Sequence, residues 1–180
     1  LCPELAIELG LNDRFVDLIE EGWDLAIRIG KLSDSTMVAR RLAPCPLVIC
    51  AAPAYLAAHS KPRRVADLQH HKCLGYTLSR SIGVGRWSFG KSGKTQVSVA
   101  GPLKANNGDA LVAAAVSGQG IVYMPRFLVA RELAEGLLHE LTLDQPPIEL
   151  DGIFAVYPSS RNPPAKVRAA VDFFAEKLRP

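Results

Sequence analysis

The stretch DALVAAAVSGQGIVYMP, residues 109–125, decides the fold class of this chain. Its first part has the apolar spacing of a short helix, and glycines then end the helix. GIVYMP (120–125) follows as a short apolar strand, and PLKANN (102–107) predicts a strand directly before the helix. A strand, a helix and a strand in this order are typical of an α/β fold.

The same alternation extends outward in both directions. The run ELAIELGL (4–11) predicts a strand, 12–22 a helix and WDLAIRIG (23–30) a buried strand, an order that indicates a parallel sheet. Residues 37–53 predict two strands broken at Pro44 and Pro46, and 164–178 predict a final helix. The sequence therefore predicts an α/β fold with mixed sheets, and the number of elements suits two small lobes.

Composition excludes several classes of protein. Hydrophobic residues make up 48% of the 180 residues and charged residues 22%, as in globular domains. A diffuse net charge of +3 is too weak to mark a nucleic-acid surface, and no apolar run approaches the roughly 18 residues that span a bilayer. No secretory signal is visible, and LCPELAIELG reads as if it began inside a domain. Cys2, Cys45, Cys50 and Cys73 show no C-x-x-C spacing, which favours free buried thiols in a reducing cytoplasm.

Residues Gly85–Ser92 match the phosphate-binding pattern G-x-x-x-x-G-K-[ST]. A phosphate loop needs small residues between its glycines and a helix after them, whereas Trp87 and Phe89 here alternate with polar neighbours. The β-branched run TQVSVA (95–100) then follows a glycine-containing turn. The segment therefore predicts a β-hairpin and no nucleotide site.

Ligands of open α/β sheets bind beyond the carboxyl ends of strands. This rule selects the following residues at strand ends: Arg28, Gly30, Tyr76, Thr77, Lys104, Asn106, Asn107, Met124, Pro125, Tyr157 and Pro158. The NNGDAL loop (106–111) is the most informative, because amides and backbone N–H groups at a helix N-terminus attract a carboxylate. The alternative is that Asn107 or Asp109 merely caps the helix, which does not exclude contact with a ligand.

Catalytic and metal-binding patterns are sparse. HHKC (70–73) suggests a metal, but adjacent histidines aim poorly at one ion, and a polar segment is the preferred interpretation. Asp24 and Asp109 have no partner in sequence that would make an acid–base pair, and no nucleophile motif occurs. We therefore expect no catalytic residue, no metal, no cofactor and no enzymatic activity.

Several motifs in order closely resemble the effector-binding region of LysR-type transcriptional regulators. They are LGLNDRFVDLIEEGWDLAIRIG, ARRLAPCPLVICAAPAYLAAH, HKCLGY, LKANNGDALVAAAVSGQGIVYMPRFLV and YPSSRNPPAKVRAAVDFFAEKL. The resemblance implies a fold like the type 2 periplasmic binding proteins, with lobe I from residues 1–49 and 151–180 and lobe II from 50–150. It also implies that lobe I lacks its opening strand and helix, and that a small carboxylated or aromatic effector binds between the lobes. The effector-binding residues that the resemblance implies are Arg28, Ile29, Gly30, Tyr76, Thr77, Asn106, Asn107, Gly108, Asp109, Met124 and Pro125.

The resemblance further implies a homodimer or homotetramer, and DNA contact only through a winged helix-turn-helix that these residues do not contain. The segments ELAIEL (4–9) and RFLVARELAEG (126–136) are our expected oligomer surfaces. We expect a cytoplasmic protein with no membrane contact. The first alternative is a solute-binding protein of a transporter, which shares the fold but needs a leader or lipid anchor. The second is an enzyme on the same scaffold.

Overall fold

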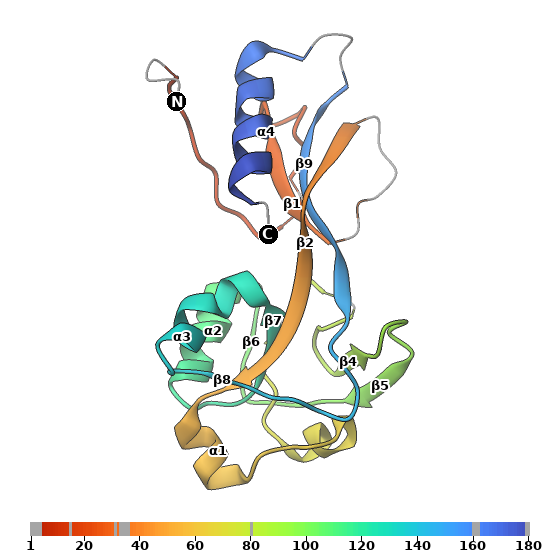
Figure 1. The fold of residues 1–180 in the computed structure, drawn as a ribbon, viewed down its shortest axis with the longest axis vertical. Coiled ribbons are helices and arrows are strands. Elements are labelled where there is room, and N and C mark those ends of the chain that lie inside the picture. Colours follow the sequence, from red (N-terminus) through yellow and green to blue (C-terminus); the bar gives the residue numbers. More distant parts are fainter. Residues whose placement is uncertain are drawn as a thin grey trace. The chain divides into compact units, whose positions relative to one another are not determined.

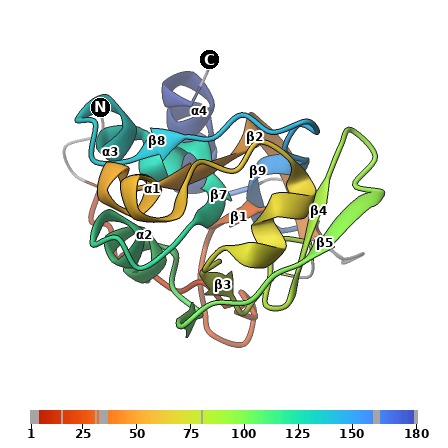
Figure 2. The same cartoon turned by 90° about the horizontal axis from the view of Figure 1, so that it is seen from below.

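The computed structural model describes residues 5–14, 16–30, 32, 37–79, 81–159 and 163–178. The chain divides into two compact units, each with its own contacts. The first unit comprises Leu1–Cys45 with Leu150–Pro180, and the second comprises Pro46–Glu149. Figures 1 and 2 show the elements of both units from two directions.

The first unit is built on an antiparallel sheet. Strand β1 (Ala26–Ile29) pairs antiparallel with β9 (Glu149–Pro158), and β9 also neighbours β2 (Met37–Ala51). Helix α4 (Ala165–Lys177) lies against this sheet in Figure 1. Its Val167 and Val171 are 4% and 3% exposed and share a core with Leu42, Ala43, Cys45, Ile153 and Ala155. The predicted final helix is thus confirmed, with its apolar side on the sheet.

The expected strand at 4–11, helix at 12–22 and parallel sheet of this region are wrong. Residues 5–14 contain no strand, and residues 18–22 form turns in which Asp17 accepts hydrogen bonds from the Ile19 and Glu20 N–H groups. The side chains of Ile7 and Leu9 are 78% and 75% exposed, so these two residues do not belong to a core. An extended segment that has no pairing strand does not form a stable β-strand. A single turn of helix is likewise unstable, because helix nucleation costs more free energy than one turn returns.

The second unit contains the parallel pairing. Strands β3 (Gly75–Tyr76) and β6 (Lys104–Ala105) pair in parallel, while β7 (Val122–Pro125) and β8 (His139–Glu140) pair antiparallel with the end of β2. Its helices are α1 (Pro53–His59), η1 (Val65–His70), α2 (Gly108–Val116), η2 (Arg126–Val129) and α3 (Ala130–Ala134). The short helix predicted in the first part of residues 109–125 is confirmed as α2.

Strand β2 is one continuous strand of 15 residues, which corrects the expected break at Pro44 and Pro46. Both prolines are exposed, and the first residue of β2 that pairs with β7 is Leu47, directly after Pro46. The fixed φ of proline suits an extended chain, and the only loss is a hydrogen-bond donor. The prolines stand where the strand passes from the first unit to the second, so this loss falls outside the β7 ladder.

The hairpin predicted around the phosphate-loop match is confirmed. Strands β4 (Arg86–Phe89) and β5 (Thr95–Ser98) pair antiparallel with Trp87 opposite Val97. Trp87 and Phe89 are fully buried, and both rings contact Tyr123, with ring centres 5.5 and 5.1 Å away. The indole of Trp87 donates a hydrogen bond to Gly83 O at 3.1 Å. These aromatic side chains are part of the core of the second unit.

The described thiols are buried, as the cysteine spacing predicts. Cys45, Cys50 and Cys73 are free, and burial raises the pKa of the Cys50 and Cys73 thiols to about 12. Thiols of such high pKa are poor nucleophiles at neutral pH. Cys2 lies outside the described residues. Among the described residues, no helix has the length and apolar character needed to cross a membrane.

Candidate functional site

The carboxyl ends of β3 and β6 lie side by side in the second unit. Gly75 N donates to Leu103 O at 3.0 Å and Thr77 N donates to Ala105 O at 2.9 Å, which fixes the parallel register. The register places Tyr76 and Thr77 beside the start of the NNGDAL loop, which continues directly from β6. Thr77 and Asn106 are exposed and Tyr76 is half-buried. Two strand ends and one loop therefore present polar side chains at one edge of the sheet.

Helix α2 begins in this loop, and Asn107 is its N-cap. The Asn107 Oδ1 accepts a hydrogen bond from Ala110 N at 2.9 Å, and Asp109 supplies a carboxylate in the first turn. Both groups complement the partial positive charge of a helix N-terminus. The capping interpretation is therefore confirmed for Asn107, and the Asn107 amide nitrogen and the exposed Asn106 side chain remain at the same edge.

Gly108 fixes how closely the neighbouring helix approaches this edge. A Cβ atom at Gly108 would lie 3.0 Å from Leu128 Cδ1, so the start of α2 packs tightly on η2. Met124 and Pro125 directly precede η2 and pair with Val48 and Leu47 of β2. Met124 is only 2% exposed, so its side chain belongs to the core. Because these two residues end β7, which is paired with β2, they determine where η2 begins beside α2.

Arg28, Ile29 and Gly30 lie in the first unit, at the end of β1. Arg28 Nη2 donates to Val16 O at 2.7 Å, so this guanidinium holds the preceding loop. Gly30 has a φ of +91°, which favours glycine, and its N–H donates to Gly152 O at 2.9 Å. Ile29 is 42% exposed. The hydrogen bond between Arg28 and Val16 could not be predicted from the sequence, because it depends on the path of the loop that contains Val16.

Sequence reasoning missed the serine-containing loop that follows Thr77. Ser79 Oγ accepts hydrogen bonds from Ser81 N and Ile82 N at 3.3 and 3.2 Å, which closes a tight turn directly after β3. A Cβ atom at Gly83 would lie 1.9 Å from Ser79 O, so only glycine fits the turn. The composition SRSIGVG (79–85) was the available signal, because Ser and Gly dominate such turns. Ser79 and Ser81 therefore join the candidate site.

The histidine-rich segment forms a hydrogen-bonded cluster around Tyr55. The Tyr55 hydroxyl accepts from Lys72 N at 2.9 Å and lies 3.2 Å from His71 Nδ1. The ring of His59 stacks on Tyr55 with centres 4.3 Å apart. In the part of the chain that the structure describes, no group of three His, Cys, Asp or Glu side chains is placed to hold a metal ion. The geometry gives His71 a structural role beside Tyr55.

We expect the protein to lose stability as the pH falls below about 6.5, the ordinary histidine pKa. Burial, followed by the neighbouring His59 charge, lowers the pKa of His71 in the folded state, against an opposing contribution from Asp67. The unfolded state then binds the proton more readily, so acid favours unfolding. Urea unfolding midpoints at pH 7.5 and 5.5 measure the difference. His71→Asn should reduce that difference, and an unchanged pH dependence in this variant would contradict the assignment.

Comparison with known proteins shows the family of this chain. The LysR substrate binding domain family matches residues 1–179. The chain belongs to this family. It is 34% identical to the regulator DmlR of Escherichia coli over 97% of its length, and 32% identical to the regulator CrgA of Neisseria meningitidis over 98%. It spans 56% and 58% of the lengths of these two proteins.

Solved structures agree with the sequence relatives. The structure of CrgA, a LysR-type transcriptional regulator, matches 91% of this chain and 55% of its own chain, with a TM-score of 0.79 and 33% identity. Full-length AphB of Vibrio cholerae, a virulence activator, matches 99% of this chain and 60% of its own, with a TM-score of 0.80 and 26% identity. The LysR fold class, mixed α/β and like the periplasmic binding proteins, is therefore confirmed. These matched proteins are regulators and not transporter solute-binding proteins.

Proposed function

We propose that this chain is the part of a LysR-type regulator that senses a small-molecule effector and oligomerises. The observation that carries the proposal is the shared edge of β3, β6 and α2, which carries Thr77, Asn106 and Asn107. Donor groups at this edge suit a carboxylate, and the half-buried ring of Tyr76 suits an aromatic or other apolar body. We propose residues 50–150 as effector lobe II and residues 1–49 with 151–180 as lobe I.

We also propose Arg28–Gly30 of lobe I as effector-binding residues, and we propose that the bound effector is not chemically changed. Its binding shifts an equilibrium between two arrangements of the regulator, by no more than its difference in affinity for them. A winged helix-turn-helix outside this chain contacts DNA. The protein works in the cytoplasm and is not an enzyme. The relatives, which are transcriptional regulators, support both statements.

Thermal-shift measurements with a panel of small aliphatic and aromatic carboxylates test the effector site. A ligand that binds the folded protein raises its melting temperature by mass action. For any acid that does so, we expect Thr77→Val, Asn106→Ala and Asn107→Ser to reduce the shift, because each removes a polar group at the edge. Asn107→Ser retains a good N-cap, so its loss of binding is separable from loss of helix stability. Gln96→Ala, on the exposed side of β5, is the control. A shift that all of these variants retain would disprove the site.

We also propose a homodimer or homotetramer that uses the segments 4–9 and 126–136. Exposed apolar side chains support both surfaces: Ile7 and Leu9 in the first, and Phe127, which is 48% exposed, in the second. We expect the wild-type chain to sediment as a dimer. We expect the Phe127→Ser and Ile7→Ser variants to sediment as monomers. A wild-type chain that stays monomeric at high concentration would argue against these surfaces.

A further inference from the structure

Positive charge is concentrated in one part of the second unit. Residues 61–104 contain nine Lys or Arg residues and one acidic residue, whereas residues 105–149 contain two basic and six acidic residues. The first unit contains ten basic and eleven acidic residues. The net charge of +3 is therefore the balance between a strong local excess of positive charge and acidic residues elsewhere in the chain.

The fold brings two basic segments of this region together. Figure 2 shows η1 (yellow) beside the labelled strands β4 and β5, and β5 packs against η1. The chain at 144–147 connects the loop before η1 with the hairpin turn: Asp144 N donates to Arg63 O at 3.0 Å, and Gly90 N donates to Pro146 O at 2.8 Å. Two residues of extended chain span roughly 7 Å, so this loop and the hairpin turn are neighbours.

The two segments carry exposed cations. We call the following five residues the basic surface: Lys61, Arg63, Arg64, Lys91 and Lys94. Among the residues that the structure describes, Arg63, Lys91 and Lys94 have no ion-pair partner. Their charges are therefore available to a partner molecule.

Two acidic residues lie beside the basic surface, and backbone N–H groups occupy both. Asp67 Oδ2 accepts from Arg63 N and Arg64 N at 2.9 and 2.8 Å, and these hydrogen bonds lower the pKa of its carboxyl group. Asp144 Oδ1 accepts from Val65 N at 2.7 Å. The two carboxylates hold the loop before η1 in shape, and the five cations exceed them by three charges.

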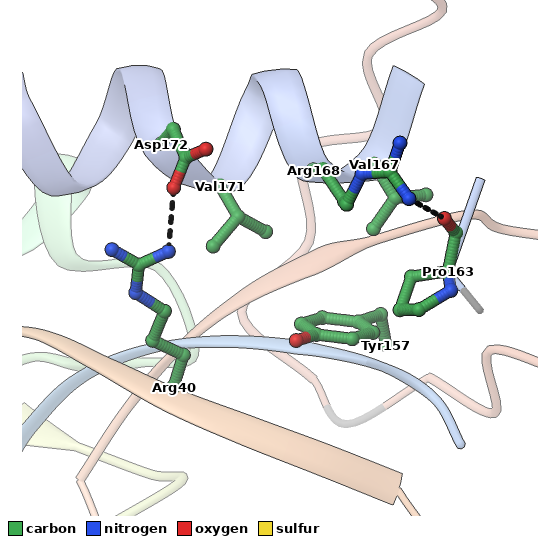
Figure 3. A pocket seen from close by; sticks show the side chains of 7 residues that line it. All are labelled: Arg40, Tyr157, Pro163, Val167, Arg168, Val171 and Asp172. Carbon is green, nitrogen blue, oxygen red and sulfur yellow. Dashed lines mark hydrogen bonds and ion pairs between the residues drawn. The ribbon is translucent and has the colours of Figure 1, made fainter. Parts of the chain in front are cut away.

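The cations of the first unit are arranged differently. In Figure 3, Arg40 Nη1 pairs with Asp172 Oδ1 at 2.6 Å, and Arg168 Nη1 donates to Pro163 O at 3.2 Å. Each of these guanidinium groups has a partner of its own, and acidic residues outnumber basic residues in this unit. The excess of positive charge therefore belongs to the second unit.

A surface of several exposed cations fits a polyanion with closely spaced charges. Double-stranded DNA carries one negative charge per about 1.7 Å of its axis, and Lys and Arg side chains contact its phosphates without reading the bases. In the proposed function, a winged helix-turn-helix of the same regulator holds DNA. A duplex held in this way is present at a high effective concentration, so weak additional contacts contribute to binding.

We propose that the basic surface contacts the phosphate backbone of DNA that flanks the site bound by the winged helix-turn-helix. This inference rests on the proposed function, because that function brings DNA to the regulator. The contact is electrostatic and independent of base sequence. It supplements the winged helix-turn-helix, whereas the family resemblance alone implies DNA contact through that domain only.

The test uses the complete 180-residue chain and a short fluorescent DNA duplex of arbitrary sequence. Fluorescence anisotropy at salt concentrations from about 20 to 200 mM should show weak binding whose logarithm falls linearly with log salt. We expect the double variant Lys91→Gln/Lys94→Gln to reduce the slope by about 2 and the affinity at the lowest salt by about tenfold. Lys166→Gln/Lys177→Gln removes an equal charge from α4 of the first unit and should change the slope by less than about 0.5.

Three results would overturn the proposal. They are no binding at the lowest salt, an equal loss of slope in the two double variants, and equal affinity for poly-L-glutamate at the same charge concentration. The last result would indicate an acidic protein partner instead of DNA. Failure here leaves the proposed function standing, because thermal shifts in the Thr77 and Asn106 variants test that function separately. The Lys91→Gln/Lys94→Gln variant should retain any such carboxylate shift.

Discussion

Replacing Trp87 with alanine is expected to lower the free energy of unfolding by about 4 kcal/mol. The side chain is fully buried, packs edge-on against Tyr123 and donates to Gly83 O. Its removal leaves a cavity in the core of the second unit, and a buried carbonyl loses its indole partner. Urea or thermal unfolding monitored by circular dichroism measures the loss. An effect of this size would leave little of the 5–15 kcal/mol that stabilises a typical domain.

Two further variants make this result specific. Arg86→Ala alters the exposed neighbour on the same strand and should change stability by less than about 0.5 kcal/mol. Trp87→Phe keeps most of the apolar volume, so its loss should fall between those of the other two variants. If Gly85–Ser92 were a phosphate loop, substituting Trp87 would instead alter nucleotide affinity with little loss of stability. That outcome would contradict the hairpin.

Replacing Gly101 with alanine is expected to cost about 3 kcal/mol, the upper range for overpacking a core. A Cβ atom at this position would lie 2.1 Å from Cys73 O and 2.9 Å from Cys73 N. Those are backbone atoms, so no side-chain rotation can relieve the clash. Residues 72 and 73 form parallel bridges to Ala100 and Ile121, and the Cys73 N–H donates to Ala100 O at 2.8 Å. The added methyl group would force these segments apart.

The consequence of Gly101→Ala reaches the candidate effector site. The bridged segments lead directly into β3 and β6, whose ends carry Thr77 and Asn106. We therefore expect this variant to lose stability and effector response together. Ala100→Ser changes an exposed neighbour and serves as the matched control, with an expected change below about 0.5 kcal/mol. A stable Gly101→Ala protein would show that the two backbones are less tightly packed than the structure indicates.

The edge at Thr77 and Asn106 follows from a general rule about strand ends, so its residues can be predicted from the sequence. The ion pair between Arg40 and Asp172 left no sequence signal, because its residues are 132 positions apart and belong to different elements. A long-range pair of charges becomes visible only when a sheet and a helix have packed.

The sequence by itself determined the features that depend on neighbours along the chain. The hairpin at 86–98 follows from alternation around a glycine turn, the start of α2 from Asn107, and the inward side of α4 from its apolar spacing. Tertiary structure alone decided which segments find partners. Strand β2 runs through Pro44 and Pro46 because its neighbours change there, and β1 is antiparallel because its partner β9 lies more than a hundred residues away. Residues 5–14 lack regular structure for the same reason: backbone hydrogen bonds between strands require a partner, and periodicity does not specify one.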